Sequence, residues 1–278
     1  MSGIGAMATW ACMKRFIPFV TPDPMVAVIR LSGVISSSPR AGVLSDQSTA
    51  PLIEKAFRKG KPKAVALVIN SPGGSPAQSS LIAARIRRLA EEKDVPVHAF
   101  VEDVAASGGY WLACAADDIW LDASSIAGSI GVISASFGLH DFISRHGIER
   151  RVHTAGKDKS MLDPFRPERE EDVERLEALQ AQIHESFIDH VTSSRGDRLA
   201  DGSEIFTGEF WVGPRAVDLG LADGLAHLVP KMKELYGDKT RFAVYGPKRG
   251  LFQRFGASLA GEALGQIEDR ALWARMGL

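Results

Sequence analysis

The chain has 278 residues, 45% of them hydrophobic and 24% charged, a composition that predicts a globular protein with a large core. Its 33 basic and 34 acidic residues leave a net charge of −1, which gives no electrostatic basis for binding nucleic acid. The two cysteines, Cys12 and Cys114, are too few for a disulfide framework and indicate free thiols in a reducing compartment. We find no cluster of metal-ligating residues in the sequence and predict no metal site.

The first 24 residues form an N-terminal extension that predicts no transmembrane helix. Lys14 and Arg15 interrupt its apolar residues, and the prolines that follow prevent a continuous spanning helix. The basic pair follows the apolar stretch, whereas in a secretory signal peptide it precedes that stretch. We therefore predict a cytoplasmic protein whose first residues are frayed. The alternative is peripheral membrane association through the aromatic residues of the extension.

Strand and helix patterns alternate from residue 25 onward. Apolar, β-branched runs predict strands at 25–31 and 64–69, and apolar residues at helical spacing predict helices at 52–57 and 81–89. The second strand is apolar throughout, which is typical of a strand that is covered on both faces in a parallel sheet. This part of the chain therefore predicts an α/β fold.

A glycine-rich turn, residues 70–75, joins the second strand to the second helix. Gly73 and Gly74 follow Pro72 and let the backbone turn with its amides facing outward, a shape that binds an anion or an oxyanion. No Gly-Lys-Ser or Gly-Lys-Thr follows, so the turn is not a phosphate-binding P-loop. An ordinary connection between a strand and a helix is the alternative interpretation.

Ser107 lies in residues 103–111, the stretch of the sequence that is most informative about function. An apolar strand pattern at 95–101 precedes it, and an apolar helix pattern at 110–116 follows. A serine at such a junction is a candidate nucleophile, because the unpaired amides of a helix N-terminus, Gly108 among them, stabilise a carbonyl oxygen that becomes negative. The match to the G-x-S-x-G pattern is partial. A helix cap in a tight turn is the alternative interpretation.

The later part of the chain continues the alternation. The patterns predict strands at 118–122 and 150–154, helices at 139–146, 168–191 and 216–220, and a returning strand or turn to 225. The repetition favours a largely parallel sheet. Residues 231–278 carry apolar side chains at loose helical spacing and predict a helical tail that packs on its own domain or on another subunit.

A serine nucleophile needs a general base, and none of the seven histidines stands in a triad motif. His184 and His190 fall beside polar neighbours on the long helix, and we interpret them as surface residues. The S-x-x-K arrangement is absent, so the better candidate for the general base is a lysine from the distant loop 156–165. This lysine is either Lys157 or Lys159. A lysine acts as a base near neutral pH only if burial or nearby positive charge favours its neutral form.

Four motifs in this order resemble those of the protease IV / signal peptide peptidase A family, a likeness that covers about residues 25–230. They are NSPGG at 70–74, VAASGGY at 104–110, GSIGV at 128–132 and GKDKS at 156–160. The resemblance implies the Clp protease/crotonase-like α/β fold, with repeated β-β-α units, a largely parallel sheet and a long C-terminal helix. It divides the chain into the extension (1–24), a serine peptidase domain (25–230) and a helical tail (231–278).

The same resemblance implies a Ser-Lys dyad, with Ser107 as the nucleophile and Lys159 as the general base. Ser129 would orient the lysine, and the amides of Gly74 and Gly108 would form the oxyanion hole. Lys159 is preferred because the dyad lysine of the family directly precedes the acidic or serine residue that ends this loop motif. Lys157 is the fallback.

The predicted function is hydrolysis of peptide bonds through an acyl-enzyme, without a cofactor. Signal peptides or other membrane-derived peptides are the expected substrates, and a homo-oligomeric ring that shelters the dyad is the expected assembly. Many relatives carry an N-terminal membrane anchor, which this sequence does not show. The alternatives are a crotonase-like acyl-CoA enzyme, which would need neither dyad residue, and a catalytically silent scaffold subunit of the same fold.

Overall fold

The computed structural model describes residues 23–38, 42–156, 158–200, 203–246 and 270–277. A single sheet organises these residues, with the strand order β6-β5-β3-β2-β1-β8 and with β4 and β7 joined to the side of β3. Its central strands are β1 (Met25–Ser32), β2 (Ala64–Ser71) and β3 (Val97–Ala106), which run parallel to one another. The α/β fold with a largely parallel sheet is confirmed.

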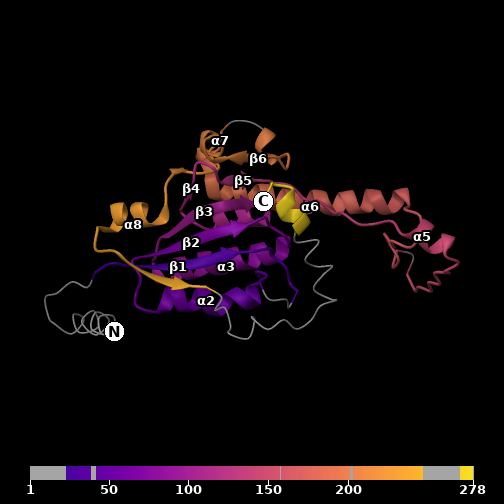
Figure 1. The fold of residues 1–278 in the computed structure, drawn as a ribbon, viewed down its shortest axis with the longest axis horizontal. Helices are drawn as coiled ribbons and strands as arrows, with labels where there is room; N and C mark the ends of the chain where they lie inside the picture. The colour runs from indigo at the N-terminus through magenta and orange to yellow at the C-terminus, as the bar shows by residue number, and fades with distance from the viewer. Residues whose placement is uncertain (1–22, 39–41, 157, 201–202, 247–269, 278) are drawn as a thin grey trace.

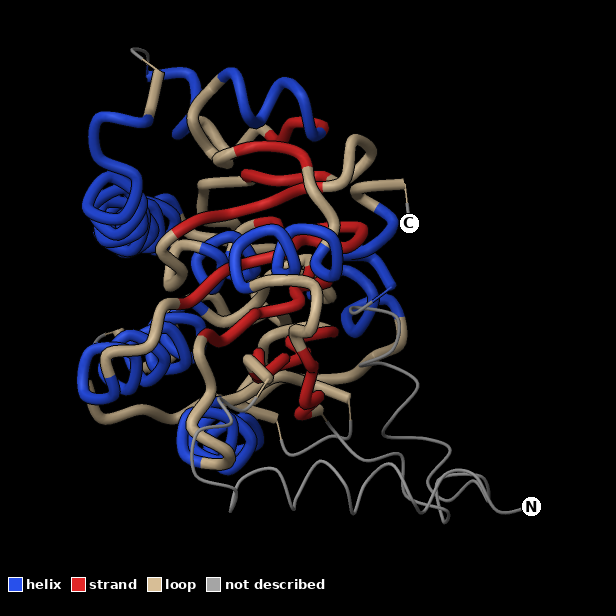
Figure 2. The backbone as a smooth tube through the Cα atoms, turned by 90° about the vertical axis from the view of Figure 1, so that its left-hand side faces the viewer, coloured by secondary structure: helices blue, strands red, loops and turns tan. Residues whose placement is uncertain are grey.

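The two faces of the central strands are covered by different helices. The larger core lies on the face covered by α2 (Asp46–Arg58), α3 (Pro76–Lys93) and α4 (Gly108–Ala113). The smaller core on the opposite face includes Met232 of α8 (Leu228–Tyr236). Figure 2 shows helices gathered along one side of the strands. Because β2 lies between both cores, its apolar run has no polar face, as the sequence predicted.

The N-terminal ends of α2 and α3 are fixed by serine caps. Ser45 caps α2 through a reciprocal pair of hydrogen bonds with Ser48, a capping box. Ser75 caps α3 by accepting from the Gln78 amide, and Pro76 follows at the first helical position. The Ser75 cap fixes where the chain leaves the glycine turn that follows β2, and hence the position of that turn.

The second half of the sheet is built from short strands. They are β4 (Asp118–Leu121), β5 (Ile126–Gly128), β6 (Phe210–Val212) and β7 (Gly224–Leu225). The intervening helical segments are η2 (Gly196–Arg198), η3 (Ser203–Phe206) and α7 (Gly213–Asp218). Strand β5 continues the sheet beside the C-terminal end of β3, with Ala106 opposite Gly128. The carboxyl ends of β3 and β5 therefore lie next to each other.

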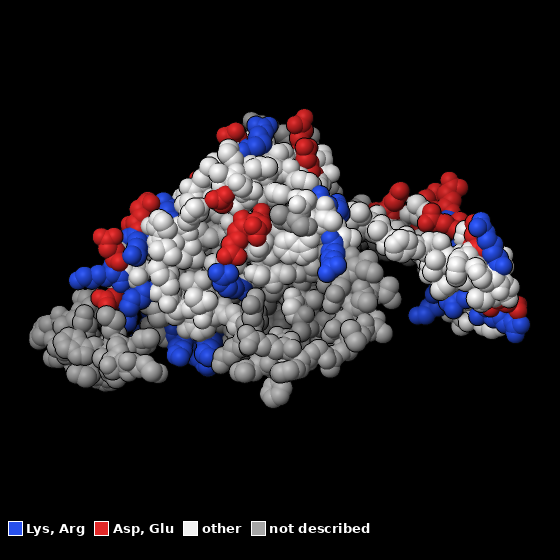
Figure 3. All heavy atoms as spheres, viewed as in Figure 1, with Lys and Arg blue, Asp and Glu red and all other residues white. Residues whose placement is uncertain are grey.

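An arm projects from the body of the molecule (Figure 1). It consists of α5 (His140–Arg145), the loops on either side of it and the N-terminal half of α6 (Glu170–Arg195). Its far end carries crowded side chains of both charges (Figure 3). The C-terminal half of α6 packs on the body through Phe187 and Val191, whereas Leu179 and Ile183 are 47% and 38% exposed. The long apolar stripe predicted for this helix is thus only partly a core face.

Two expectations differ from the structure. Residues 150–154, predicted as a strand, are irregular and mostly exposed, and none of the described strands pairs with them. The segment from 231, predicted as a helical tail, contains the strand β8 (Arg241–Tyr245), which pairs with β1 at the edge of the main sheet. The tail residues 251–264 that suggested subunit packing lie outside the described residues, as does the N-terminal extension through residue 22.

Candidate active site

Ser107 is held in an uncommon backbone conformation at the junction of β3 and α4. Its φ is 51° and its ψ is −122°, a region that residues other than glycine rarely occupy and that costs free energy unless the surroundings fix it. The Ser107 amide donates to the Gly128 carbonyl at 2.8 Å, and the Trp111 amide donates to the Ser107 carbonyl at 3.0 Å. The Ser107 side chain makes no capping hydrogen bond, so its hydroxyl stays available for another role.

The glycine turn after β2 packs directly against Ser107. Gly73 and Gly74 have φ values of 101° and 137°, and a Cβ atom added to Gly74 would lie 2.0 Å from the Ile35 carbonyl oxygen. Ile35 fixes the turn because its amide donates to Gly73 and its carbonyl accepts from Ser75, both at 2.8 Å. A Cβ added to Gly73 would lie 2.8 Å from the Ser107 Cβ. Glycine is therefore required for this close approach.

The amides of Gly74 and Gly108 lie next to each other. A Cβ built on Gly108 would lie 3.4 Å from the Gly74 nitrogen, which shows how close the turn comes to the start of α4. Neither amide donates any of the turn, loop and cap hydrogen bonds that the described residues form. Two free donors beside a serine at a helix N-terminus have the arrangement of an oxyanion hole.

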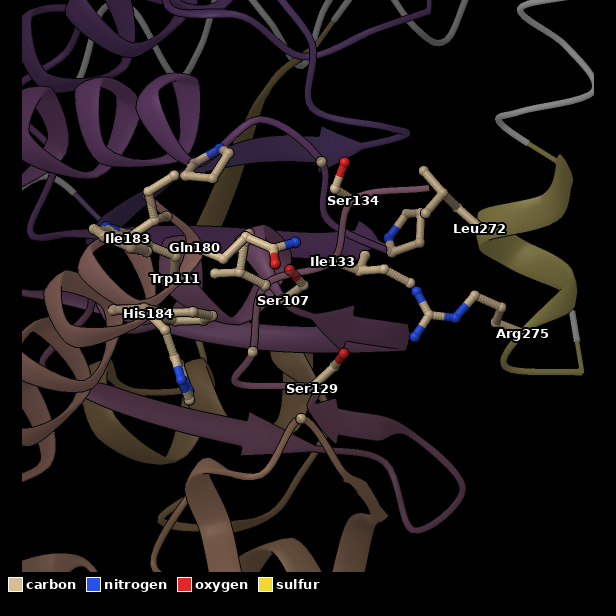
Figure 4. Close-up of a pocket in the computed structure, with 18 of the residues that line it drawn as sticks. Ser107, Trp111, Ser129, Ile133, Ser134, Gln180, Ile183, His184, Leu272 and Arg275 are labelled. Carbon is tan, nitrogen blue, oxygen red and sulfur yellow. The ribbon is translucent and has the colours of Figure 1, made fainter. Parts of the chain in front are cut away.

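Ser129 directly follows β5, as Ser107 directly follows the neighbouring strand β3. It directly follows Gly128, and its φ of 53° is again positive. Its amide donates to the Glu209 carbonyl at 2.6 Å, which fixes the backbone. Figure 4 shows the hydroxyls of Ser107 and Ser129 in the same cavity. The structure therefore brings together four of the five residues that the sequence singled out, namely Ser107, Ser129, Gly74 and Gly108.

The cavity around Ser107 has a volume of about 830 Å³, which suits a ligand the size of a short peptide. Its walls are mainly apolar and come from α4, α6, the glycine turns and the C-terminal segment. The larger apolar side chains are Trp111, Ile133, Leu176, Leu179, Ile183, Phe187, Phe210, Leu272 and Met276. The exposed apolar stripe of α6 thus forms a wall of this cavity.

Two histidines fasten α6 to the backbone of the site. His184 Nε2 donates to the Ile130 carbonyl at 3.1 Å, and His190 Nε2 donates to the Trp111 carbonyl at 3.0 Å. The His190 ring also stacks on Trp111 with 4.7 Å between ring centroids. Both side chains are half-buried, contrary to the surface positions that we expected. Burial lowers the pKa of His190 below its ordinary value of 6.5.

Lys159 lies on the arm and does not line the cavity. Its side chain is exposed, and its neighbour Asp158 pairs with Arg175 of α6 at 2.7 Å. Arg175 and Phe187, which stacks on Trp111, are twelve residues apart along α6. At 1.5 Å per residue this separation is about 18 Å. Within one copy of the chain, the predicted base is therefore absent from the cavity that contains the predicted nucleophile. Lys157 lies outside the described residues.

A reactive cysteine and a metal centre are two alternative kinds of site, and neither is found in the part of the chain that the structure describes. Burial raises the pKa of the Cys114 thiol to about 12, so this cysteine stays protonated. No three His, Cys, Asp or Glu side chains among the described residues are grouped to hold a metal ion. A half-buried serine that lines the cavity, its strained backbone and the two neighbouring amides together have the arrangement of a serine hydrolase site.

The model of Peptidase family S49 matches residues 89–237 of the chain. The matched region includes Ser107, Ser129 and Lys159, whereas the Gly74 turn precedes it. The chain belongs to Peptidase family S49. The family that the sequence predicted is thereby confirmed.

Three curated relatives illustrate this membership. The Na(+)/H(+) antiporter NhaA of Brucella melitensis biotype 1 is 46% identical over 96% of this chain, which spans 39% of that protein. The chloroplastic serine protease SPPA of Arabidopsis thaliana is 35% identical over 73% of this chain and 31% of its own length. A Synechocystis protein named as a protease is 30% identical over 75% of this chain and 72% of its own length. Since the chain spans 39% and 31% of the first two, the names of those whole proteins do not describe it.

Solved structures share the fold at low sequence identity. A serine-to-alanine mutant of the 1510-N membrane-bound stomatin-specific protease is 15% identical, with a TM-score of 0.50 over 83% of this chain and 100% of that chain. A lysine-to-alanine mutant of the same protease, in complex with a substrate peptide, is 14% identical, with a TM-score of 0.52 over 82% of this chain and 95% of that chain. Among the described helices of the present chain, none is both long and apolar enough to span a membrane.

Proposed function

We propose that the chain is a serine endopeptidase in which Ser107 attacks the peptide carbonyl and Lys159 is the general base. The observation that carries this proposal is the strained Ser107, whose uncapped hydroxyl faces a cavity beside two unpaired amides. The strained backbone of Ser107 lowers the stability of the fold, whereas its uncapped hydroxyl and the two amides are the groups that an acyl transfer requires. Membership of Peptidase family S49 supports the same assignment.

The proposed reaction uses these residues in order. The neutral amine of Lys159 takes the hydroxyl proton of Ser107, and Oγ bonds to the peptide carbonyl carbon. The amides of Gly74 and Gly108 donate to the oxygen that becomes negative. The C–N bond then breaks, the leaving amine takes the proton from Lys159, and an acyl-enzyme remains. Lys159 next activates a water molecule that hydrolyses the acyl-enzyme, while Ser129 orients the lysine.

Because Lys159 does not line the cavity that contains Ser107 of its own chain, we infer that it serves Ser107 of a neighbouring copy. The arm that carries it exposes large apolar side chains in α5 and in the residues on either side of it. Ile133, Phe137, Phe142 and Ile148 are 64%, 83%, 58% and 56% exposed. An exposed apolar group of this kind favours contact with another protein surface. A ring of identical contacts would complete every site, because each arm would reach the next copy.

Peptides that derive from membrane proteins, including cleaved signal peptides, are the proposed substrates. The apolar walls of the cavity favour apolar side chains around the scissile bond. The structural neighbour with a bound substrate peptide is named as a membrane-bound, stomatin-specific protease, which agrees with such a substrate class. Apolar peptides released from membrane proteins would be accessible to a peptidase that is located beside the membrane.

Mixing two inactive variants tests the proposal. Ser107→Ala and Lys159→Ala are each expected to lose peptide hydrolysis, because each removes half of one catalytic unit. When the two variants are unfolded and refolded together, a site shared between copies regains Ser107 from one chain and Lys159 from the other. Random assembly then restores about a quarter of the wild-type sites.

The outcome separates the parts of the proposal. A dyad within a single chain would leave the mixture inactive, because neither variant holds both residues. If Lys159→Ala hydrolyses peptides without the other variant present, Lys159 is not the base. If Lys157→Ala is the inactive variant, Lys157 is the base instead. Activity in Ser107→Ala would end the proposal altogether.

A further inference from the structure

The C-terminal segment of the chain forms part of the wall of the active-site cavity. Residues 270–274 form a helical turn, and the Arg275 amide donates to the Ala271 carbonyl at 3.2 Å. Leu272, Arg275 and Met276 all line the cavity that contains Ser107. Their spacing of i, i+3 and i+4 places them on one face of the helical turn. This face of the segment is therefore turned toward the catalytic serine.

Arg275 is the one residue with a permanent charge among those that line the cavity. The other lining residues are apolar or neutral polar side chains, glycines and His184, and no Asp or Glu is among them. Figure 4 shows the Arg275 guanidinium extending from the segment toward Ser129 and Ser107. Among the described residues, Arg275 forms no ion pair. The Arg275 side chain is exposed, so its uncompensated charge gives a positive potential on the solvent-facing part of an otherwise neutral cavity.

A peptide substrate in this cavity contains few groups that can form an ion pair with the Arg275 guanidinium. Carboxylates are the peptide groups that match a guanidinium in charge and in its planar, two-pronged geometry. The cavity, if spherical, would be roughly 12 Å across, a span that an extended peptide covers in about four residues. A carboxylate that reaches Arg275 must therefore lie close to the bond that Ser107 attacks.

We propose that Arg275 is a specificity-determining residue that binds a carboxylate of the peptide substrate, within about four residues of the scissile bond. This inference rests on the proposed peptidase function of the same site. The carboxylate belongs either to the free C-terminus of the peptide or to an Asp or Glu side chain. Both sources offer the same chemistry to the guanidinium.

A set of three matched peptides tests the proposal in the full-length chain. One eight-residue apolar peptide is made with a Gln and an amidated C-terminus, with a Glu and an amidated C-terminus, and with the Gln and a free C-terminal carboxylate. The wild type is expected to cleave one carboxylate peptide with a kcat/KM about tenfold or more above that of the neutral peptide. Arg275→Gln is expected to reduce this ratio to near one, and Arg275→Lys to retain part of it.

Arg270→Gln is the matched control, because Arg270 is an exposed arginine of the same segment that does not line the cavity. It is expected to keep the wild-type ratio. The preferred peptide identifies the source of the carboxylate. A wild-type ratio near one, or a ratio that Arg275→Gln leaves unchanged, would overturn the proposal. An equal rise of all three rates in Arg275→Gln would also overturn it, because the segment would then obstruct the cleft instead of selecting substrates.

A binding measurement separates this proposal from the peptidase function. In Ser107→Ala, fluorescence anisotropy of the three labelled peptides reports affinity without any hydrolysis. The carboxylate peptide is expected to bind about tenfold more tightly than the neutral peptide, and the added Arg275→Gln change is expected to remove the difference. Equal affinities would overturn the role of Arg275, even if hydrolysis were fully established.

Discussion

Replacement of Gly74 by alanine is the sharpest test of the glycine turn. The added Cβ would lie 2.0 Å from the Ile35 carbonyl oxygen, and this oxygen belongs to the backbone, so no side-chain rotation relieves the contact. The turn must move, and the two hydrogen bonds that join Ile35 to Gly73 and Ser75 are lost or weakened. The same movement displaces the Gly74 amide from the proposed oxyanion hole.

Gly237→Ala provides the matched control. Gly237 also has a positive φ, 94°, but a Cβ there would meet nothing within 4 Å. Both variants carry the cost of a side chain in a backbone region reserved for glycine, about 1–3 kcal/mol. Gly74→Ala additionally loses two hydrogen bonds at about 1 kcal/mol each. The free energy of unfolding is therefore expected to fall by about 2 kcal/mol more in Gly74→Ala than in Gly237→Ala.

Urea unfolding gives the stability difference, and peptide hydrolysis gives kcat under conditions where circular dichroism shows both variants to be folded. Gly74→Ala is expected to lower kcat by about 10²–10³-fold, the usual effect of losing one oxyanion donor, and Gly237→Ala to keep the wild-type value. Equal stabilities for the two variants would refute the packing argument. A wild-type kcat in Gly74→Ala would refute the role of its amide.

Three further predictions concern pH and assembly. If chemistry limits the rate, kcat is expected to rise from mildly acidic to alkaline pH, because a lysine base must lose its proton; a flat profile would argue against Lys159. Burial lowers the pKa of His190 in the folded protein, so above pH 6.5 this side chain is neutral in both the folded and the unfolded chain. At lower pH the unfolded chain binds the proton first, and acid therefore favours unfolding. Urea midpoints at about pH 7.5 and about pH 5.5 should therefore differ more in the wild type than in His190→Gln. Phe137→Ser on the arm is expected to reduce both assembly, measured by light scattering, and activity. Val244→Ser, at a similarly exposed valine of β8, should change neither.

Local patterns in the sequence were sufficient for much of the fold and for part of the site. The apolar runs at 25–31 and 64–69 fall within β1 and β2, because such runs need only local β-propensity and burial. Ser107 was also found locally, since a strand pattern, a serine, two glycines and a helix pattern adjoin one another. The structure adds the positive φ of Ser107 and its missing cap, which no sequence pattern reveals.

Features that depend on distant partners were not predictable in this way. Residues 150–154 have strand-like side chains, but a strand requires a neighbour, and no strand among the described residues pairs with them. His184 and His190 have polar sequence neighbours, yet their partners are carbonyls 54 and 79 residues away. The β8 sequence, Arg-Phe-Ala-Val-Tyr after a Gly-Asp-Lys-Thr turn, did carry a short strand signal that we overlooked.

The most direct test of the central claim is the residue on which an active-site probe forms a covalent bond. The full-length protein is incubated with a fluorophosphonate probe, digested, and mapped by mass spectrometry. The label is expected on Ser107, absent from Ser107→Ala and formed much more slowly in Lys159→Ala than in Lys157→Ala, because only the proposed base activates the hydroxyl. A label on another serine, or a labelling rate that Lys159→Ala leaves at the wild-type value, would contradict a Ser107–Lys159 peptidase.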